Sequence, residues 1–254
     1  MIKVFSFVAS CRGKYSKTAR MSNDLAKRFI EKAEAAGETV EYEMMTGDQL
    51  RVDYCRSCNN CFMKGECPLD SVDDMAKLKS KFLEADIIFF GTPVYLWEMS
   101  GMAKSVLDRI SYWTHRLELA GKIGVTFDTT SSSHGPEVAE NLKKLLEFTG
   151  MNVVSTAYAL SDGHPTLYYK KDMDPIYDEI CDRLLEAWKD PTAFITEDNE
   201  NVFLNIKAKT KQRVKLAELT GREPAAETMV NYERGIMEFD NYKEMLISIK
   251  KEKE

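Results

Sequence analysis

Five short apolar segments alternate with five segments of helical periodicity over the first 190 residues, and this alternation limits the possible fold more than any other feature. The apolar segments at 2–8 and 86–91 predict buried parallel strands, and the segment at 39–45 alternates in the way typical of an edge strand. The full set of predicted strands is 2–8, 39–45, 86–91, 122–127 and 152–158, and the predicted helices are 18–36, 71–83, 100–113, 136–148 and 174–188.

Strands that alternate with helices predict a doubly wound α/β fold, in which a parallel sheet is covered by helices through right-handed crossovers. Sheets of this kind bind ligands beyond the carboxyl ends of their strands, at the point where the strand order reverses. We therefore expect the functional residues directly after the first, third and fourth strands.

The chain divides near Pro191 into a sheet domain, residues 1–190, and an extension, residues 191–254. Residues 47–70 lack a clean period and form an inserted loop. In the extension we expect irregular structure at 192–204, followed by short helices at 205–219, 225–236 and 239–251. The extension has too few apolar residues for a core of its own, so we expect it to pack on the sheet domain or on a partner subunit.

Charge and hydropathy exclude several classes of protein. The formal net charge of −6 gives no sign of nucleic-acid binding. No apolar run approaches the length of a membrane span. The chain enters an apolar strand at once, without the layout of a signal peptide, and four of its six cysteines are clustered, so a cytoplasmic protein is expected.

The first predicted loop, after residue 8, is rich in hydroxyl groups and cations and opens a helix. A phosphate monoester needs hydrogen-bond donors and positive charge, and a helix amino terminus adds to both. The loop contains neither dinucleotide-binding nor P-loop glycine spacing. The alternative is a polar turn in which Ser16 caps the helix. The candidate phosphate ligands are Ser10, Arg12, Ser16, Lys17 and Thr18.

The second predicted loop follows the strand at 86–91 and carries flat apolar side chains suited to an aromatic ligand. Its aromatic residues could equally fill the core beneath the next helix. The candidate ligand contacts are Pro93, Val94, Tyr95, Leu96 and Trp97.

The third predicted loop, residues 128–135, is rich in hydroxyl groups and poor in bulk, so it could surround a ring edge that carries carbonyl groups. A flexible surface loop is the alternative. Its candidate contacts are Thr129, Thr130, Ser131 and Gly135, and His134 could contact the ligand or cap the following helix.

Together these loops resemble the flavodoxin-like NAD(P)H-dependent FMN reductase superfamily, and most closely its iron–sulfur flavoprotein branch. The resemblance covers about residues 1–155 and departs from the family pattern at Cys11 and Lys17. It rests on Ala9-Ser10-Cys11-Arg12, Ser16-Lys17-Thr18, Thr92-Pro93-Val94-Tyr95, Met99-Ser100, Ala103-Lys104 and Asp108-Arg109. It implies a flavodoxin-like five-stranded sheet of order 2-1-3-4-5 and FMN, with the phosphate on the first loop and the isoalloxazine between the other two.

Four cysteines in the pattern C-x2-C-x2-C-x5-C-P lie in the inserted loop. Such compact spacing suits a 4Fe-4S cluster. Structural zinc sites usually use two Cys-x-x-Cys pairs separated by a longer segment. The pattern also resembles the cysteine motif of iron–sulfur flavoproteins. Free or redox-active thiols are the alternative. The candidate ligands are Cys55, Cys58, Cys61 and Cys67.

These features predict an FMN-dependent oxidoreductase that passes electrons between FMN and a 4Fe-4S cluster, with NAD(P)H as one reductant. The alternatives are a cluster-free NAD(P)H-dependent FMN or quinone-type reductase, and a non-enzymatic flavin carrier that docks a protein. Tyr95 and His134 are the candidate catalytic residues. The expected partners are a small-molecule or protein electron donor or acceptor, and a second copy in a homodimer or homotetramer.

Overall fold

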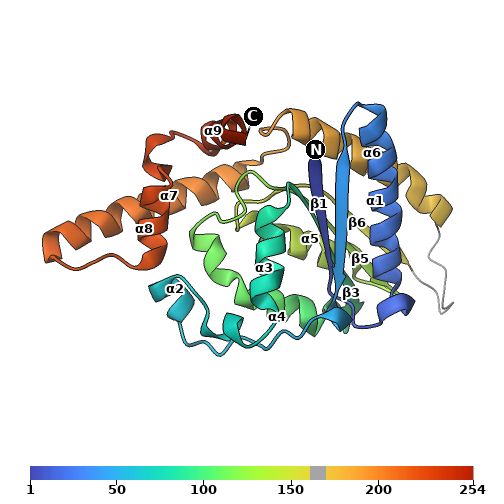
Figure 1. The fold of residues 1–254 in the computed structure, drawn as a ribbon, viewed down its shortest axis with the longest axis horizontal. Coiled ribbons are helices and arrows are strands. Elements are labelled where there is room, and N and C mark those ends of the chain that lie inside the picture. Colours follow the sequence, from blue (N-terminus) through green and yellow to red (C-terminus); the bar gives the residue numbers. More distant parts are fainter. Residues whose placement is uncertain (161–169, 254) are drawn as a thin grey trace.

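The central sheet is parallel and has the strand order β2-β1-β3-β5-β6 (Figure 1). The computed structural model describes residues 1–160 and 170–253. The strands are β1 (Ile2–Val8), β2 (Val40–Thr46), β3 (Ile87–Tyr95), β5 (Ile123–Thr130) and β6 (Asn152–Leu160), and the short β4 (Glu98–Met99) pairs antiparallel with β3. This arrangement confirms the predicted fold, because β5 and β6 are the fourth and fifth strands of the expected 2-1-3-4-5 order.

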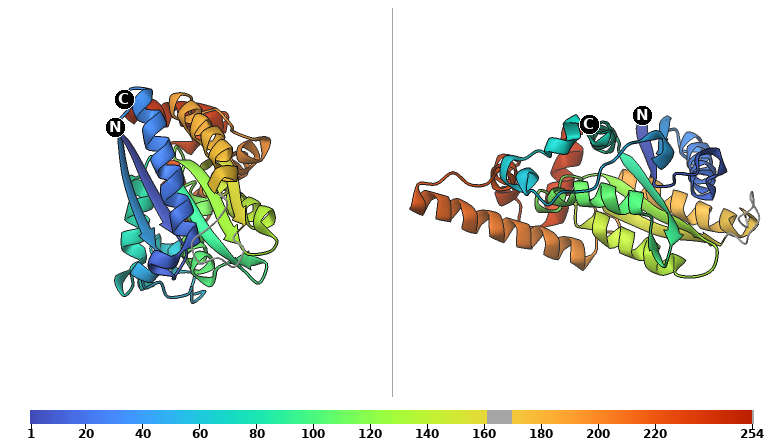
Figure 2. Two further views of the ribbon diagram at one scale, coloured as in Figure 1. Left: turned by 90° about the vertical axis from the view of Figure 1, so that its right-hand side faces the viewer. Right: turned by 90° about the horizontal axis from the view of Figure 1, so that it is seen from below.

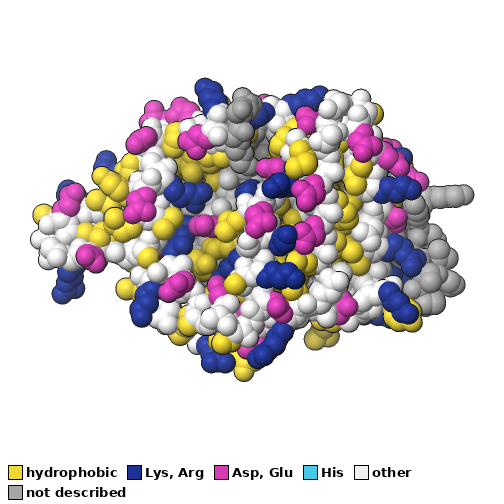
Figure 3. Space-filling model, viewed as in Figure 1, with side chains coloured by type: hydrophobic (Ala, Val, Ile, Leu, Met, Phe, Trp, Pro, Cys, Tyr) yellow, Lys and Arg dark blue, Asp and Glu magenta, His cyan; other side chains and the backbone are white. Residues whose placement is uncertain are grey.

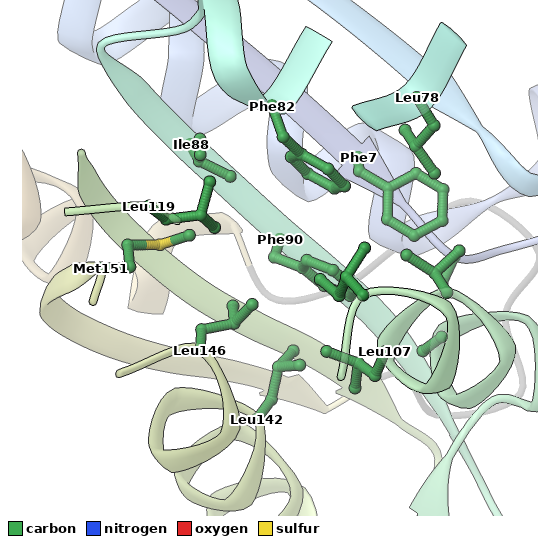
Figure 4. Packing of buried hydrophobic residues seen from close by; sticks show 14 of the residues in the cluster. Phe7, Leu78, Phe82, Ile88, Phe90, Leu107, Leu119, Leu142, Leu146 and Met151 are labelled. Atoms are coloured by element: carbon green, nitrogen blue, oxygen red, sulfur yellow. The ribbon is translucent and has the colours of Figure 1, made fainter. Parts of the chain in front are cut away.

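Helices cover both faces of the sheet. One face packs against α1 (Lys17–Ala35) and α6 (Lys170–Lys189). The other packs against α3 (Met75–Glu84), α4 (Gly101–Arg109) and α5 (Gly135–Glu147), with Phe7, Phe82 and Phe90 in mutual ring contact at its centre (Figure 4). Gly91 is required where β3 passes Phe127, because a Cβ atom at this position would lie 2.3 Å from the phenyl ring.

Strands β3 and β5 extend further than the sequence predicts. Val94 and Tyr95 pair with β4, and Asp128–Thr130 pair with β6. The prediction ended both strands early because Pro93 and the run of hydroxyl residues after Phe127 are typical of loops. Consequently Pro93, Val94, Tyr95, Thr129 and Thr130, which were expected in loops, lie on strands.

The inserted loop is held at both ends by Arg109, which projects from the end of α4. Arg109 Nη1 donates to the backbone oxygen of Asp53 at 2.9 Å and to Asp73, and Nη2 donates to Asp70 at 2.6 Å. Arg109 and the Asp73 carboxylate are buried. Burial alone would raise the pKa of Asp73, but hydrogen bonds from Arg109 and from backbone amides hold this pKa below its usual value. We call this group the Arg109 clamp.

The loop contains only short helical elements. They are the 3-10 turn Gly47–Gln49, the helix α2 (Asn60–Lys64) and the 3-10 turn Pro68–Ser71. Lys79 of α3 adds an ion pair to Asp70 at 2.6 Å. The loop therefore keeps its place through side-chain contacts with α3 and α4 rather than through regular secondary structure.

The extension folds into α7 (Glu197–Thr220), α8 (Ala226–Glu233) and α9 (Tyr242–Lys253). The expectation of irregular structure at 192–204 is wrong from residue 197 onward, because Thr196 and Asn199 form a reciprocal capping box that starts α7. Phe203, Tyr242 and Leu246 pack against Leu117 and form a third core, so the extension shares buried surface with the sheet domain. The division at residue 190 stays a prediction.

The α7–α8 arm projects beyond the sheet (Figures 1 and 2). Together with α2 it lines an open pocket of about 750 Å³. Figure 3 shows apolar side chains gathered on this arm. The pocket wall includes Phe62, Met63, Leu216, Ala217, Pro224 and Ala225. Among the helices in the described part of the chain, none combines the length and apolar character that a membrane crossing needs.

Replacing Arg109 tests the clamp. In Arg109→Met, Asp70 and Asp73 lose their buried partner, and we expect unfolding to become easier by roughly 3–5 kcal/mol in urea titrations. Limited proteolysis should cut between residues 53 and 73 first. Lys104→Met on the same helix removes an exposed ion pair with Asp108 and should change stability by less than about 1 kcal/mol. Equal effects of the two substitutions would contradict the clamp.

Candidate functional site

The first predicted loop leads into the amino terminus of α1. Ser16 caps this helix, with its Oγ accepting from the Ala19 amide at 3.1 Å, which confirms the capping interpretation. Ser10 is buried, and its hydroxyl accepts a long bond from the Arg12 amide. In the cap Ser16 Oγ acts as the acceptor and keeps its own proton. The donors of the loop therefore include the Ser16 hydroxyl, the backbone amides of the first turn and the side chains of Arg12 and Lys17.

The charge at this helix terminus fits a phosphate. The amides of the first turn have no acceptor within the helix, and the helix dipole favours negative charge there. Yet the first turn of α1 contains no acidic residue, and Lys17 occupies its first position. A cation at a helix amino terminus is unfavourable unless an anion offsets it, so the chemistry of this loop suits the terminal phosphate of FMN.

The second predicted loop is the turn between β3 and β4. Leu96 and Trp97 adopt positive φ angles of 49° and 67°. Residues other than glycine rarely adopt this backbone conformation. Leu96 is 97% exposed, and Tyr95 and Trp97 are exposed as well. Strained backbone and exposed apolar side chains in one turn are typical of a surface that a flat ligand covers.

The third predicted loop meets both of the others. The hydroxyl oxygens of Thr129 and Thr18 lie 2.7 Å apart, which links the end of β5 to the first turn of α1. His134 precedes α5 with a φ of 64°, and its ring stacks on Trp97 with 4.6 Å between the centroids. Thr130 donates to the backbone oxygen of Ser133, Ser131 is exposed, and Gly135 is buried at the start of α5.

Two further residues of this region were missed by sequence reasoning. In the sequence, Ser100 is identified only as part of the Met99-Ser100 match. It caps α4, accepting from the Ala103 amide, and also donates to the backbone oxygen of Ala9 at 2.7 Å, so it ties the second loop to the first. Asp128 was assigned to a loop, but it lies on β5 with no exposed surface, beside Thr92 of β3. The sequence carried one signal for a buried Asp128, because this acidic residue directly follows the apolar segment 122–127.

The carboxyl group of Asp128 is buried and forms no ion pair with a described residue. Neither carboxylate oxygen has a hydrogen-bond partner among the described residues. Burial raises the pKa of Asp128 to about 8, Glu137 adds to the effect, and the nearby Ala139 amide opposes it. Asp128 is therefore mostly protonated at neutral pH, one residue before Thr129.

The two candidate catalytic residues lie on the same surface. Tyr95 is at the end of β3, and His134 Nδ1 lies 2.9 Å from the hydroxyl of Ser133. Catalytic roles for Tyr95 and His134 stay predictions.

The four clustered cysteines lie within one loop, but not in a ligating arrangement. Cys58 is exposed and the other three are partly buried. Burial first, and then the charges of Cys67 and Cys55, raise the pKa of the Cys61 thiol. Over residues 1–160 and 170–253, no three histidine, cysteine or acidic side chains are placed to hold a metal ion. The donor set suits an iron–sulfur cluster, and ligation would require the loop to close around it.

Comparison with known proteins bears on the class of this site. Residues 2–165 match the family described as NADPH-dependent FMN reductase. Among curated relatives, the chain is 29% identical over 151 residues to an iron-sulfur flavoprotein of Archaeoglobus fulgidus and 27% identical over 134 residues to one of Methanocaldococcus jannaschii. These matches cover 59% and 53% of this chain, and 64% and 66% of the relatives.

Solved structures agree on the fold. An NADH:FMN oxidoreductase in its apo form superposes with a TM-score of 0.51 at 17% identity, covering 72% of this chain and 89% of the other. A flavone reductase superposes with a TM-score of 0.55 at 16% identity, covering 77% and 66% respectively. At such low identity the likeness shows the flavodoxin-like fold alone.

The fold and the family model together give the class to which this chain belongs. The chain belongs to the NADPH-dependent FMN reductase family, which confirms the resemblance seen in its three loops. It spans slightly less than two thirds of the curated relatives it matches.

The buried acid gives a testable pH dependence. The folded protein holds the proton of Asp128 more tightly than the unfolded chain, so this contribution to stability is complete below about pH 4 and is lost as the pH rises toward 8. Asp128→Asn stays neutral, so its free energy of unfolding should rise relative to the unchanged protein by about 1.4 kcal/mol per pH unit, roughly 4 kcal/mol between pH 5 and pH 8. Urea unfolding at several pH values measures this gain.

Glu140→Gln on the exposed face of α5 is the control for Asp128→Asn. It should keep the pH profile of the unchanged protein. If Asp128→Asn kept that profile too, Asp128 would be ionised throughout this range.

Proposed function

We propose that this chain binds FMN at the carboxyl ends of β1, β3 and β5 and catalyses its reduction by NADPH. The observation that carries the proposal is the convergence of three loops in a member of an FMN-dependent family. The Thr18–Thr129 contact joins the first loop to the third, and the Trp97–His134 stack joins the third to the second.

Each loop supplies a different part of the proposed site. The first-turn amides of α1, with Lys17 and Arg12, would bind the phosphate. The turn at Leu96 and Trp97 would cover one face of the ring and exclude water. When bound, FMN supplies the capacity to accept a hydride and to pass electrons on, and the protein contributes orientation and electrostatics.

Electrostatics also indicate how the chain would tune this cofactor. The buried and largely neutral Asp128 would add no negative charge next to the ring site, whereas an ionised carboxylate there would disfavour electron uptake. Tyr95 and His134 remain the side chains best placed to exchange a proton with a bound substrate.

Phosphate recognition is tested by comparing two flavins. Lys17→Glu places negative charge at the α1 terminus and should weaken FMN binding at least tenfold, about 1.4 kcal/mol, in fluorescence titrations of the apoprotein. Riboflavin, which lacks the phosphate, should bind this variant and the unchanged protein within about twofold of each other.

Lys27→Glu, an exposed change further along α1, is the matched control and should leave both affinities unchanged. Failure of the unchanged protein to bind FMN would reject the proposed site. Equal losses for FMN and riboflavin would instead place the phosphate elsewhere.

As a finer proposal, the inserted loop carries a 4Fe-4S cluster that exchanges electrons with FMN. Support comes from the compact four-cysteine pattern of the loop, from the Arg109 clamp that holds both ends of the loop, and from the description of two relatives as iron-sulfur flavoproteins. Cys55, Cys58, Cys61 and Cys67 would hold the cluster, whose role would be to pass electrons singly.

Anaerobic purification with iron and acid-labile sulfide assays tests the cluster. We expect about four irons per chain, and loss of most of this iron in Cys58→Ser. Cys11→Ser, an exposed cysteine outside the loop, should keep the iron. Flavin without iron in the unchanged protein would assign the cysteines to zinc binding or to thiol chemistry.

A further inference from the structure

One buried cation beside the cysteine loop forms no ion pair within residues 1–160 and 170–253. Arg116 follows the 3-10 turn Ser111–His115 and is 8% exposed. Its Nε and Nη2 atoms are buried and have no hydrogen-bond partner in the part of the chain that the structure describes. The guanidinium lies 4.9 Å from the ring centre of Tyr112. A buried cation held only by an aromatic ring is costly, since a native structure normally pairs such a charge.

The unpaired guanidinium faces the segment that joins two of the cysteines. A Cβ atom built on Gly65 would lie 3.0 Å from Arg116 Nη2. Gly65 ends α2, and its amide donates to the backbone oxygen of Cys61 at 3.2 Å. Arg116 therefore lies against the turn between Cys61 and Cys67.

The other buried cations near the loop are already compensated. Arg109 and Lys79 bind the carboxylates of Asp70 and Asp73. On the neighbouring arm, Arg213 pairs with Glu227. Among these described cations, Arg116 therefore differs in being buried without an anionic partner.

The extension holds Arg116 in this place. From α8, Asn231 Nδ2 donates to the backbone oxygen of His115 at 2.7 Å, and Arg234 Nη1 donates to the backbone oxygen of Arg116 at 2.8 Å. Ala226, at the start of α8, lies against Gly65. Helix α8 thus fixes the backbone of Arg116 and covers the loop from the side of the arm.

We propose that Arg116 is a positioning residue that compensates the negative charge of a metal–thiolate centre on the cysteine loop. The inference rests on the cluster proposed above. A cubane cluster with four thiolate ligands carries net negative charge, and each added electron increases it. A fixed cation beside it favours the reduced state, so Arg116 raises the reduction potential and helps the loop to retain iron.

Arg116→Met and Arg116→Gln, purified without oxygen as full chains, test this role. In potentiometric titrations followed by electron paramagnetic resonance, both should lower the equilibrium constant for one-electron reduction about tenfold, equivalent to about 59 mV. Arg116→Lys keeps the charge and should stay within about threefold of the unchanged protein. Arg213→Met removes a partly exposed arginine of the arm and should leave the potential unchanged.

Thermal unfolding of the iron-free proteins gives an independent readout. Removing an unpaired buried charge should leave the melting temperature of apo Arg116→Met equal to or above that of the unchanged apoprotein. A residue with a purely structural role would instead lower it.

Three outcomes separate the inference from its foundation. If the unchanged protein binds no iron, the cluster proposal fails and the role of Arg116 fails with it. If it binds iron and both neutral variants keep its potential, the role of Arg116 alone is overturned. Lower apo stability together with an unchanged potential would likewise assign Arg116 to structure only.

Discussion

The buried ion pairs of Arg109 connect the two regions on which the proposed chemistry depends. Arg109 ends the helix that follows the β3–β4 turn, and its guanidinium reaches Asp53 before the first clustered cysteine and Asp70 and Asp73 after the last. Such a desolvated network stabilises the fold only when every charge is satisfied. A loop with little regular structure is thereby held to the helix beside the proposed flavin site.

The site combines features that are unfavourable in the free chain. Lys17 lies at the positive end of a helix, and Leu96 and Trp97 hold left-handed backbone conformations. The Asp128 carboxyl group is buried and pairs with no cation in the described part of the chain. Each costs stability by a different physical mechanism, through the helix dipole, desolvation or backbone sterics. Their concentration at the carboxyl edge of the sheet is a stronger argument for a ligand site there than any one of them.

Much of this arrangement follows from local sequence. The alternation of apolar and helical segments predicts the doubly wound sheet, and the family resemblance implies its strand order. The hydroxyl run and the Pro93–Trp97 segment locate the loops that meet. The ends of β3 and β5 were wrong because pairing with β4 and β6 overrides the turn signals of Pro93 and Thr129. The start of α7 was missed because Thr196 and Asn199 act as a capping pair within an acidic run that reads as irregular.

Contacts between distant residues lay beyond prediction from one sequence. The Arg109 carboxylate partners are more than 35 residues away, and the burial of Arg116 depends on α8, which no local pattern relates to the cysteine loop.

The contact between α8 and the cysteine loop joins two segments that leave the ribosome at different times. The last clustered cysteine, Cys67, leaves the ribosome on the order of 160 residues before Ala226, the first residue of α8. At roughly 5–20 residues per second, translation leaves the loop uncovered for about 8–30 seconds. During that interval the surface of Gly65 that Ala226 contacts in the folded protein is open to solvent, so the loop forms before its neighbour on α8 exists.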